Sequence, residues 1–321
     1  MALRLATFNL KDFFLPRSEA EHAVSEAKIG NIARELRRAN ADVVALQEVG
    51  APELLDRMVT RELADMGYGA PVLGTEDRRG IRNAILSRLP ILWSQVHTAK
   101  TLPFPKFVEG DPDPFPGRIP LRRGVVHVRV DAGAGLGEVD VMTAHFNSNL
   151  PAPLKSKDGV ELPDATLRAH GESAMRSLVQ RAAEALYVRG LVDEVLTALP
   201  DHAICVMGDL NDTVDSLPVR LLCGIDPMSR FLLRPVAPYV PEERRFSCYH
   251  GGGPSLIDHL LLSEALHRAR GEVEIFNENL RYHGPFVEGA IPLTEDSDHA
   301  LVVASFDAPS SDTVPPPGYQ S

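Results

Sequence analysis

The chain has 321 residues, of which 44% are hydrophobic and 24% charged, and its formal net charge at pH 7 is -11. This composition is typical of a soluble globular protein with a large core. An acidic surface repels nucleic acid unless a local basic groove compensates. The net charge therefore argues against tight, non-specific binding of long polyanions. It does not exclude phosphate chemistry, because a metal ion can supply the positive charge.

The three cysteines, Cys205, Cys223 and Cys248, lack the spacing of a zinc site or of a disulfide framework. No signal peptide precedes the first predicted strand, and no apolar run is long enough to span a membrane. We therefore expect a cytoplasmic protein, or a secreted one if a leader has been trimmed.

The first two predicted strands both carry a polar side chain near their ends. Residues 3–10 alternate loosely between apolar and polar and predict a strand with Asn9 near its end. A helix is expected over 29–36, and the apolar run over 41–49 predicts a second strand with Glu48 near its end. A carboxylate in that position is costly unless it is solvated, paired or bound to metal. A solvated strand end is the alternative to the metal ligand that we favour.

The following segment is predicted to contain a helix over 52–66, a strand within 79–88 and a strand over 90–96 that pairs with it as a hairpin. Residues 101–120 are rich in Pro, Phe and Asp and show no periodicity, which predicts a long surface loop. Such loops often shape a substrate site, and an irregular connector is the alternative.

Two predicted strands, over 124–130 and 138–144, lead to His145. Asn147 lies two residues further on and is in phase with it. A lone histidine is more often structural than catalytic, but His145 stands at a strand end, as Glu48 does. A functional role is therefore favoured for His145.

The middle of the chain predicts a polar loop over 151–167, which contains Lys155 and Lys157. Apolar residues then recur with helical spacing over 175–199, which predicts a long helix that Gly190 could break. The exposed arginines of this helix are expected to form a solvated face.

A buried strand is predicted over 203–207, and it ends at a glycine that is followed by Asp209 and Asn211. Side chains at alternate positions point to the same side, so these two can face one pocket. A carboxylate beside an amide suits a hard divalent cation next to a phosphate. The alternative is an ordinary turn, because Asp, Asn and Gly favour turns.

The C-terminal part is predicted to add a short helix over 215–222, strands over 246–250 and 255–263, and a last buried strand within 297–306. Asp258 lies inside an apolar strand and needs a partner, which a histidine elsewhere in the fold could supply. His259 points to the opposite face and is expected to be structural.

Five separated stretches resemble the endonuclease/exonuclease/phosphatase superfamily, which has the DNase-I-like fold. They are TFNL with Asn9, LQEV with Glu48, TAHFN with His145, MGDLND with Asp209 and Asn211, and SLIDH with Asp258, followed by SDH with Asp298 and His299. The segment RGIRNAILSRLPI is also similar to one that is common in the family. The stretches occur in the family's order across residues 3–306, and this ordered set is far more specific than any one motif.

The resemblance implies an α/β fold in one domain over 1–308, a four-layer α/β sandwich in which two packed mixed β-sheets are flanked by helices. It also implies attack of water on a phosphate ester that depends on Mg²⁺ or Mn²⁺, with Ca²⁺ as a further option. The Pro/Ser-rich composition of 309–321 predicts a disordered tail.

The resemblance also implies a role for each motif residue. Glu48 would be the main metal ligand, with Asn9 and Asp298 beside it. Asp209 would orient or deprotonate the attacking water and could also bind the metal. Carboxylates and amides of this kind neutralise charge at the phosphate and activate water.

On the phosphate side, the resemblance implies that Asn211 holds a phosphate oxygen. His299 would contact the phosphate and act as acid or base, oriented by Asp258. His145 would donate a proton to a phosphate oxygen or to the leaving group.

Basic and polar residues on loops predict a local substrate groove, although scattered solvated charges are the alternative. The candidate substrate-binding residues are Asn147, Arg82, Arg118 and Arg122, and the groove could also include Arg79, Arg123, Lys155 and Lys157.

We therefore expect a metal-dependent phosphodiesterase, specifically a nuclease that acts on DNA or RNA. The alternative is a phosphatase or phosphodiesterase that acts on a small or lipid phosphate ester. A non-catalytic pseudoenzyme that binds phosphate is disfavoured because every expected catalytic position is filled. No protein partner is implied.

Overall fold

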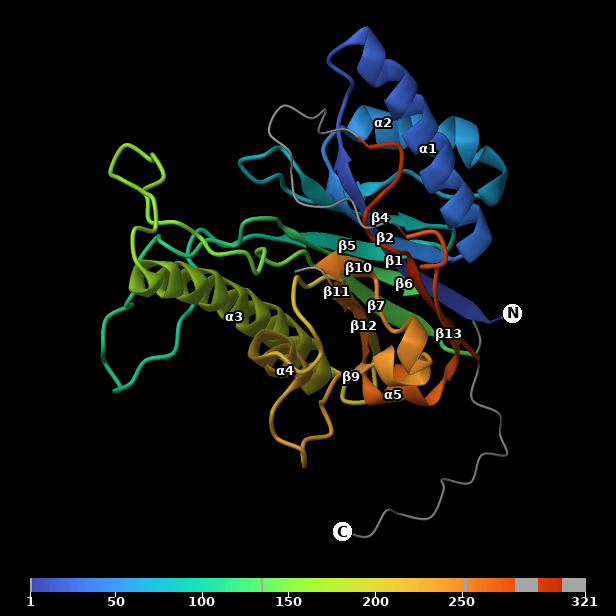
Figure 1. Ribbon diagram of the computed structural model, residues 1–321. Helices are drawn as coiled ribbons and strands as arrows, with labels where there is room; N and C mark the ends of the chain where they lie inside the picture. Colours follow the sequence, from blue (N-terminus) through green and yellow to red (C-terminus); the bar gives the residue numbers. More distant parts are fainter. Residues whose placement is uncertain (1, 134, 251–252, 281–293, 308–321) are drawn as a thin grey trace.

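The computed structural model describes residues 2–133, 135–250, 253–280 and 294–307. Its strands form two six-stranded sheets, and helices lie on the outer side of each (Figure 1). The domain boundary expected at 308 and the tail expected over 309–321 lie outside the described residues.

The first sheet has the strand order β13-β14-β1-β2-β4-β3. Its strands are β1 (Leu3–Phe13), β2 (Val43–Val49), β3 (Val72–Leu73), β4 (Arg82–Ser87), β13 (Arg270–Ile275) and β14 (Val302–Phe306). The second sheet has the order β5-β6-β7-β8-β12-β9. Its strands are β5 (Ile91–His97), β6 (Val125–Asp131), β7 (Glu138–Thr143), β8 (Ala203–Asp209), β9 (Arg234–Pro235) and β12 (Asp258–Leu262).

The remaining strands form a small hairpin of β10 (Cys248–His250) and β11 (Gly253–Ser255). The α-helices are α1 (Glu19–Ala39), α2 (Pro52–Arg57), α3 (Leu167–Ala198), α4 (Leu217–Cys223) and α5 (Glu264–Arg268). Short helical turns of other types occur at Met58–Glu62, Ala64–Met66, Ala237–Tyr239 and Glu242–Arg244.

Alternating side chains on the strands face different cores. On β2, Val43 and Ala45 pack between the sheets, whereas Val44 and Leu46 pack against α1 and α2. On β8, the odd-numbered side chains enter the same central core and the even-numbered ones pack against α3 and α4. Three cores therefore separate four layers, and the four-layer α/β sandwich expected from the sequence is confirmed.

Both sheets are mixed. β1 pairs parallel with β2 and antiparallel with β14, while β8 pairs parallel with β7 and antiparallel with β12. Parallel neighbours end at the same edge of their sheet. The polar residues near the ends of β1 and β2 therefore form one group, and those near the ends of β7 and β8 form another.

The hairpin expected between residues 79–88 and 90–96 is wrong. β4 already has β2 and β3 as neighbours in the first sheet, so it offers no free edge. β5 instead pairs with β6 in the second sheet. The chain crosses between the sheets over 88–90, and Leu89 and Ile91 pack against the central core there.

The two long helices begin earlier than their apolar periodicity indicates. α1 starts at Glu19, after the cap residue Ser18, and its first turns are polar and exposed, so they lack the apolar periodicity. It ends before Asn40, which lies in the left-handed region. α3 starts at Leu167, after the cap residue Thr166, and runs through Gly190 without a break. The helix expected over 52–66 is divided into α2 and two turns of other types.

The arginines of α3 do not all form a solvated face. Arg181 and Arg189 are buried, and each forms an ion pair with an aspartate. Residues 101–120 form no strand or helix, as expected, and Leu102 and Ile119 anchor this loop against Ala183 of α3.

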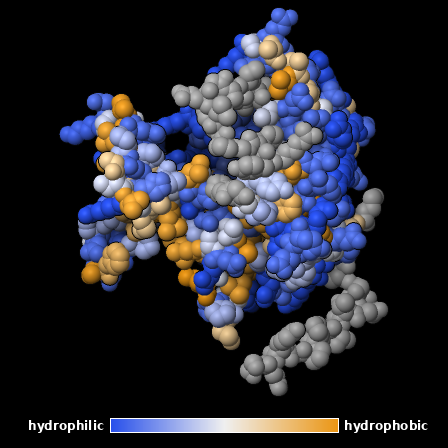
Figure 2. Space-filling view, in the orientation of Figure 1, coloured by the Kyte–Doolittle hydropathy of each residue, from blue (hydrophilic) through white to orange (hydrophobic). Residues whose placement is uncertain are grey.

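The face of the molecule in Figure 2 is mostly hydrophilic over α1 and α2, and hydrophobic side chains gather around α3 and α4. Leu167 and Met175 of α3 and Met228 beyond α4 are exposed. None of the helices in the described part of the chain combines the length and apolar character needed to cross a bilayer.

Candidate active site

Side chains from both sheets meet at one edge of the sandwich. In the first sheet, Asn9 of β1 pairs with Gln47 of β2, and Glu48 is the next residue along β2. In the second sheet, Asp209 at the end of β8 pairs with Asp258 at the start of β12. Asn9 Nδ2 donates a hydrogen bond of 2.9 Å to Asp209 Oδ2 and so joins the two sheets.

A glycine allows the strand that carries Asp209 to approach the segment that carries His145. Gly208 has a φ of 147°, and a Cβ there would lie 1.9 Å from the carbonyl oxygen of Ala144. The backbone amide of Phe146 then donates to the carbonyl of Asp209 over 3.1 Å. His145 and Asp209 therefore share one side of the pocket, with His145 Nε2 3.4 Å from Asp209 Oδ2.

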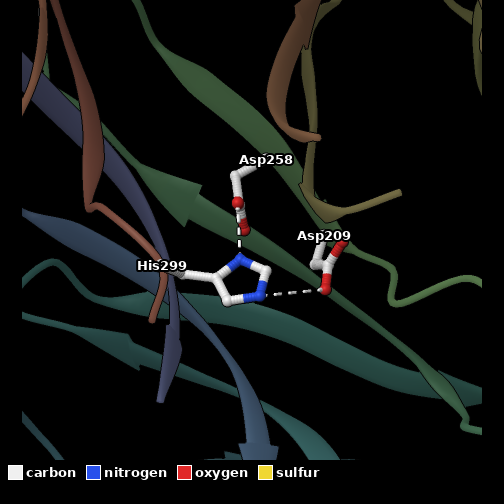
Figure 3. A group of neighbouring side chains, drawn as sticks. All are labelled: Asp209, Asp258 and His299. Carbon is white, nitrogen blue, oxygen red and sulfur yellow. Dashed lines mark hydrogen bonds and ion pairs between the residues drawn. The ribbon is translucent and has the colours of Figure 1, made fainter. Parts of the chain in front are cut away.

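Asp209, Asp258 and His299 form a compact group (Figure 3). His299 Nδ1 donates to Asp258 Oδ2 over 2.7 Å, and His299 Nε2 lies 3.9 Å from Asp209 Oδ2. Ser247 Oγ also donates to Asp258 Oδ2, over 2.6 Å. The imidazole is thus fixed on one side by a buried carboxylate and directed on the other towards Asp209.

The surroundings of this group set two unusual pKa values. Burial alone would lower the pKa of His299, but the charge and hydrogen bond of Asp258, followed by the charge of Asp209, raise it to about 10. Burial, followed by the charge of Asp258, raises the pKa of Asp209 to about 7. These shifts favour the protonated form of His299 and make the Asp209 carboxylate more basic than an ordinary one.

His145 has the opposite character. Burial, followed by the positive charges of Arg123 and His299, lowers its pKa well below the usual range. Its Nδ1 atom is buried and has no hydrogen-bond partner among the described residues. The neutral form of the His145 imidazole is therefore favoured, and one of its nitrogens is buried without a partner among the described residues.

Asn211 adopts a left-handed conformation, with a φ of 52°. Its backbone amide donates to Asp209 Oδ1 over 2.9 Å, and its Nδ2 donates to the carbonyl of Phe146 over 3.0 Å. These bonds fix both the Asp209 carboxylate and the turn after β8.

A second group, which we call the acidic pole, comprises Asp12, Glu48 and Asp298. Glu48 Oε2 accepts from the backbone amide of Asp12 over 2.8 Å, and Arg79 Nη2 lies 2.5 Å from Asp12 and 3.7 Å from Glu48. Asp298 Oδ2 lies 3.2 Å from the ammonium nitrogen of Lys11. Side-chain cations therefore contact all three carboxylates.

The acidic pole offers oxygen donors of the kind that hard divalent cations prefer, whereas the described carboxylate and histidine atoms that lie within 4.8 Å of one another are those of Asp209, Asp258 and His299. Glu48, Asp298 and Asn9 offer carboxylate and amide oxygens, the donors that Mg²⁺ and Mn²⁺ prefer. Asp298 Oδ1 is buried and has no hydrogen-bond partner among the described residues. His299 is a poorer ligand, because Nδ1 is bonded to Asp258 and the raised pKa keeps the ring protonated.

The candidate substrate-binding residues occupy different surroundings. Arg82 on β4 forms an ion pair with Glu76, while Arg118 and Arg122 are exposed on loops, where the structure gives them no contact with the residues around Asp209. The backbone amide of Asn147 donates to Glu184 Oε2 over 2.7 Å, and its side chain donates to the carbonyl of Ser148. Asn147 therefore uses both its backbone amide and its side-chain amide for contacts within the protein.

Several residues around the site were not expected from the sequence. Lys11 and Asp12 were missed because the first strand continues past Asn9 with both residues at positive φ, a conformation that the pattern of residues 3–10 does not signal. Arg123 was expected on an exposed loop, but only 6% of it is exposed and its Nε lies 3.5 Å from Asp77. Two nitrogen atoms of Arg123 are buried without a hydrogen-bond partner among the described residues.

Glu184 of α3 is fully inside the protein, where burial raises the pKa of its carboxyl while Asn147 and Arg123 counteract that effect. It supports the segment after His145 through its bond to Asn147. The sequence shows only a glutamate within the predicted helix over 175–199, and its burial is a property of the folded structure.

A model of the Endonuclease/Exonuclease/phosphatase family matches residues 6–299. No curated protein matches the sequence. The chain is similar in structure to truncated TDP2 from Caenorhabditis elegans, with a TM-score of 0.57 and 14% identity over 96% of this chain and 98% of that one.

Two further solved structures are similar. A variant of the 3' phosphatase NExo from Neisseria, bound to a product DNA hairpin, has a TM-score of 0.54 and 19% identity, over 95% of this chain and 100% of that one. An AP endonuclease from Archaeoglobus fulgidus has a TM-score of 0.52 and 13% identity, over 95% of this chain and 99% of that one. At these identities the similarities establish the fold, which is DNase-I-like.

Proposed function

Because the chain belongs to the endonuclease/exonuclease/phosphatase family, we propose that it is a divalent-metal-dependent phosphodiester hydrolase, and specifically a nuclease that acts on DNA or RNA. The observation that carries the proposal is the group of Asp209, Asp258 and His299, in which a proton acceptor and a proton donor lie 3.9 Å apart. In this proposal the acidic pole beside it holds the metal ion.

The residues of this chain account for each proton in the reaction. Water attacks phosphorus and gives its proton to Asp209, whose pKa of about 7 suits a base at neutral pH. The bond from phosphorus to the leaving oxygen breaks, and that oxygen takes a proton from His299. Proton transfer from Asp209 to His299 then restores both groups.

Other side chains hold the reactants. Asn9 and the amide of Asn211 orient the Asp209 carboxylate through hydrogen bonds of 2.9 Å each. Neutral His145 is expected to bind a phosphate oxygen in this proposal. When bound at Glu48, Asp298 and Asn9, Mg²⁺ or Mn²⁺ would neutralise charge that develops on the phosphate.

Two observations support a nucleic-acid substrate. Arg79 contacts the acidic pole, Arg82 of β4 pairs with Val49 of β2, and further arginines lie on the long loops. The similar structures include TDP2 from D. rerio complexed with a single-strand DNA product. The alternative, a phosphatase or phosphodiesterase on a small or lipid phosphate ester, is favoured by the net charge of -11.

Parallel assays of bis-p-nitrophenyl phosphate, p-nitrophenyl phosphate and plasmid DNA, each with Mg²⁺, Mn²⁺ or EDTA, test the proposal. A nuclease should cleave the diester and the plasmid only with metal, and plasmid cleavage should fall steeply as salt rises. Turnover of the monoester with intact plasmid would favour the phosphatase. Equal rates in Mg²⁺ and EDTA would contradict the metal-dependent mechanism.

A further inference from the structure

A cavity of about 460 Å³ lies where β1 and β2 end. One wall is the segment 14–17, which directly follows β1, and the other is the segment 50–53, which directly follows β2. Arg82 of β4 completes the lining. The volume lies within the range of pockets that take small ligands or one unit of a longer ligand.

Backbone hydrogen bonds connect the walls of this cavity to the reaction centre. The amides of Gly50 and Ala51 donate to the carbonyl of Phe13 over 3.0 and 2.9 Å. One residue earlier, the amide of Asp12 donates to Glu48. The cavity therefore begins within two residues of the expected metal ligand, and its position relative to that ligand is fixed.

The cavity has an aromatic side chain in its wall. The ring of Phe14 lies against the backbone of Gly50, since a Cβ at that glycine would come within 2.2 Å of the ring. A Cβ at Gly80 would lie 3.8 Å from the same ring, which places the turn that carries Arg79 next to it. The ring is only partly buried, so part of its surface remains available to a ligand.

The cavity also has cationic side chains. Arg17 is exposed, and its guanidinium forms no hydrogen bond or ion pair with the described residues. Arg82 is paired with Glu76, but its Nε atom is buried without a hydrogen-bond partner among the described residues. Glu53 is the one carboxylate in the lining.

We propose that this cavity is a subsite for the nucleotide next to the scissile phosphate, with a base against Phe14 and the neighbouring phosphate at Arg17 and Arg82. The inference rests on the proposed function and narrows it, because such a subsite serves a single-stranded oligonucleotide and not an isolated phosphate ester. Aromatic stacking and arginine contacts of this kind are the usual means of binding single strands.

The test compares a small diester with an oligonucleotide. Steady-state kinetics are measured for bis-p-nitrophenyl phosphate and for a fluorescently labelled single-stranded hexanucleotide, with the wild type and the variants Arg17→Glu, Arg17→Lys and Phe14→Ala. Arg61→Glu is the matched control, because Arg61 is an exposed arginine outside the cavity lining.

Arg17→Glu and Phe14→Ala should each raise KM for the hexanucleotide about tenfold, the loss expected for one stacking or charged contact. They should leave kcat and KM for the small diester within about twofold of the wild type, since that substrate does not reach the cavity. Arg17→Lys should retain most of the affinity, and Arg61→Glu should change neither substrate. Unchanged KM for the hexanucleotide, or an equal loss for both substrates, would overturn the subsite.

Failure of the subsite and failure of the proposed function give different results. If the wild type hydrolyses the small diester but Arg17→Glu does not change KM for the hexanucleotide, the proposed hydrolase activity is supported and the subsite is contradicted. If the wild type hydrolyses neither substrate, binding of the labelled hexanucleotide is measured by fluorescence anisotropy for the wild type and for Arg17→Glu. Binding that Arg17→Glu weakens supports the subsite without the activity, and no binding overturns both.

Discussion

Lys11 places its ammonium nitrogen 3.2 Å from the carboxylate of Asp298, one of the expected metal ligands. A positive side chain at this point would compete with a divalent cation for the Asp298 carboxylate. The pair is about one-third exposed, so solvent screens it and its contribution is about 0.2–1 kcal/mol.

Lys11→Met should therefore lower the dissociation constant for Mg²⁺ by about two- to fivefold, measured by calorimetry without substrate. Glu48→Gln should change it in the opposite direction, because it removes a charged ligand. Weaker Mg²⁺ binding in Lys11→Met would show that the lysine supports the site instead of competing for it.

Asp209→Asn should reduce kcat by about 10²-fold or more, because the amide cannot accept the proton of the attacking water. The substitution keeps the shape of the side chain, so the fold should be preserved and circular dichroism should not change. Asp56→Asn, an exposed aspartate on α2, is the matched control and should keep the wild-type rate. Retention of activity in Asp209→Asn would eliminate Asp209 as the base.

Asp258→Asn should change the pH dependence of stability. The pKa of His299, raised to about 10, means that its protonation stabilises the fold fully below the ordinary histidine pKa of about 6.5. That contribution is lost as pH rises through the folded-state pKa. Without the Asp258 charge, the variant should be much less stable than the wild type at pH 6, and the difference should shrink towards pH 10.

Urea unfolding at a series of pH values measures this effect, and NMR titration of the His299 ring measures the pKa directly. A stability difference that does not vary between pH 6 and pH 10 would contradict the assigned pair. The same NMR titration of the Asp258→Asn variant should show the pKa of His299 lowered.

Arg123→Met should destabilise the protein by about 3–5 kcal/mol, because it leaves the buried carboxyl group of Glu184 and the partly buried carboxylate of Asp77 without their cation. Adding Glu184→Gln should restore part of this loss, since the second substitution removes one of the uncompensated charges. Arg122→Met, at the exposed neighbouring position, should change the free energy of unfolding by less than about 0.5 kcal/mol. Additive losses in the double variant would argue against the coupling of Arg123 and Glu184.

Gly208→Ala should destabilise the protein by more than about 3 kcal/mol, because its Cβ would collide with the carbonyl oxygen of Ala144. Gly190→Ala is the contrasting control. Gly190 lies inside α3 with open space around it, so alanine there should raise stability by about 0.5–1 kcal/mol. Thermal melts of both variants measure the difference, and similar melting temperatures would refute the close approach of the two segments.

The sequence allowed prediction of the residues that stand at strand ends, because a buried strand and its polar end are local features. Asn9, Glu48 and Asp209 were predicted near strand ends in this way, whereas His299 and the sandwich were expected only from the resemblance carried by the ordered motifs. The pairing of β5 was wrong, because the choice of sheet depends on which strand edges are free. Likewise, the burial of Arg123 depends on α3, which is distant in sequence.

The site also differed from expectation where the backbone has an uncommon conformation. Lys11 and Asp12 have φ values of 52° and 48°, and no glycine marks these positions. The turn brings the lysine to Asp298 and the Asp12 amide to Glu48. These contacts arise from tertiary packing, which local propensity does not encode.

The hydrogen bond between Asn9 and Asp209 joins residues that are 200 positions apart, and His299 enters the site from near the end of the chain. The reaction centre therefore has no local folding unit of its own, and contacts of such long range form late and slowly. During refolding from urea, helical and strand signals should recover before phosphoester hydrolysis does. In the proposed mechanism, a nascent chain is expected to stay inactive until residue 299 has emerged.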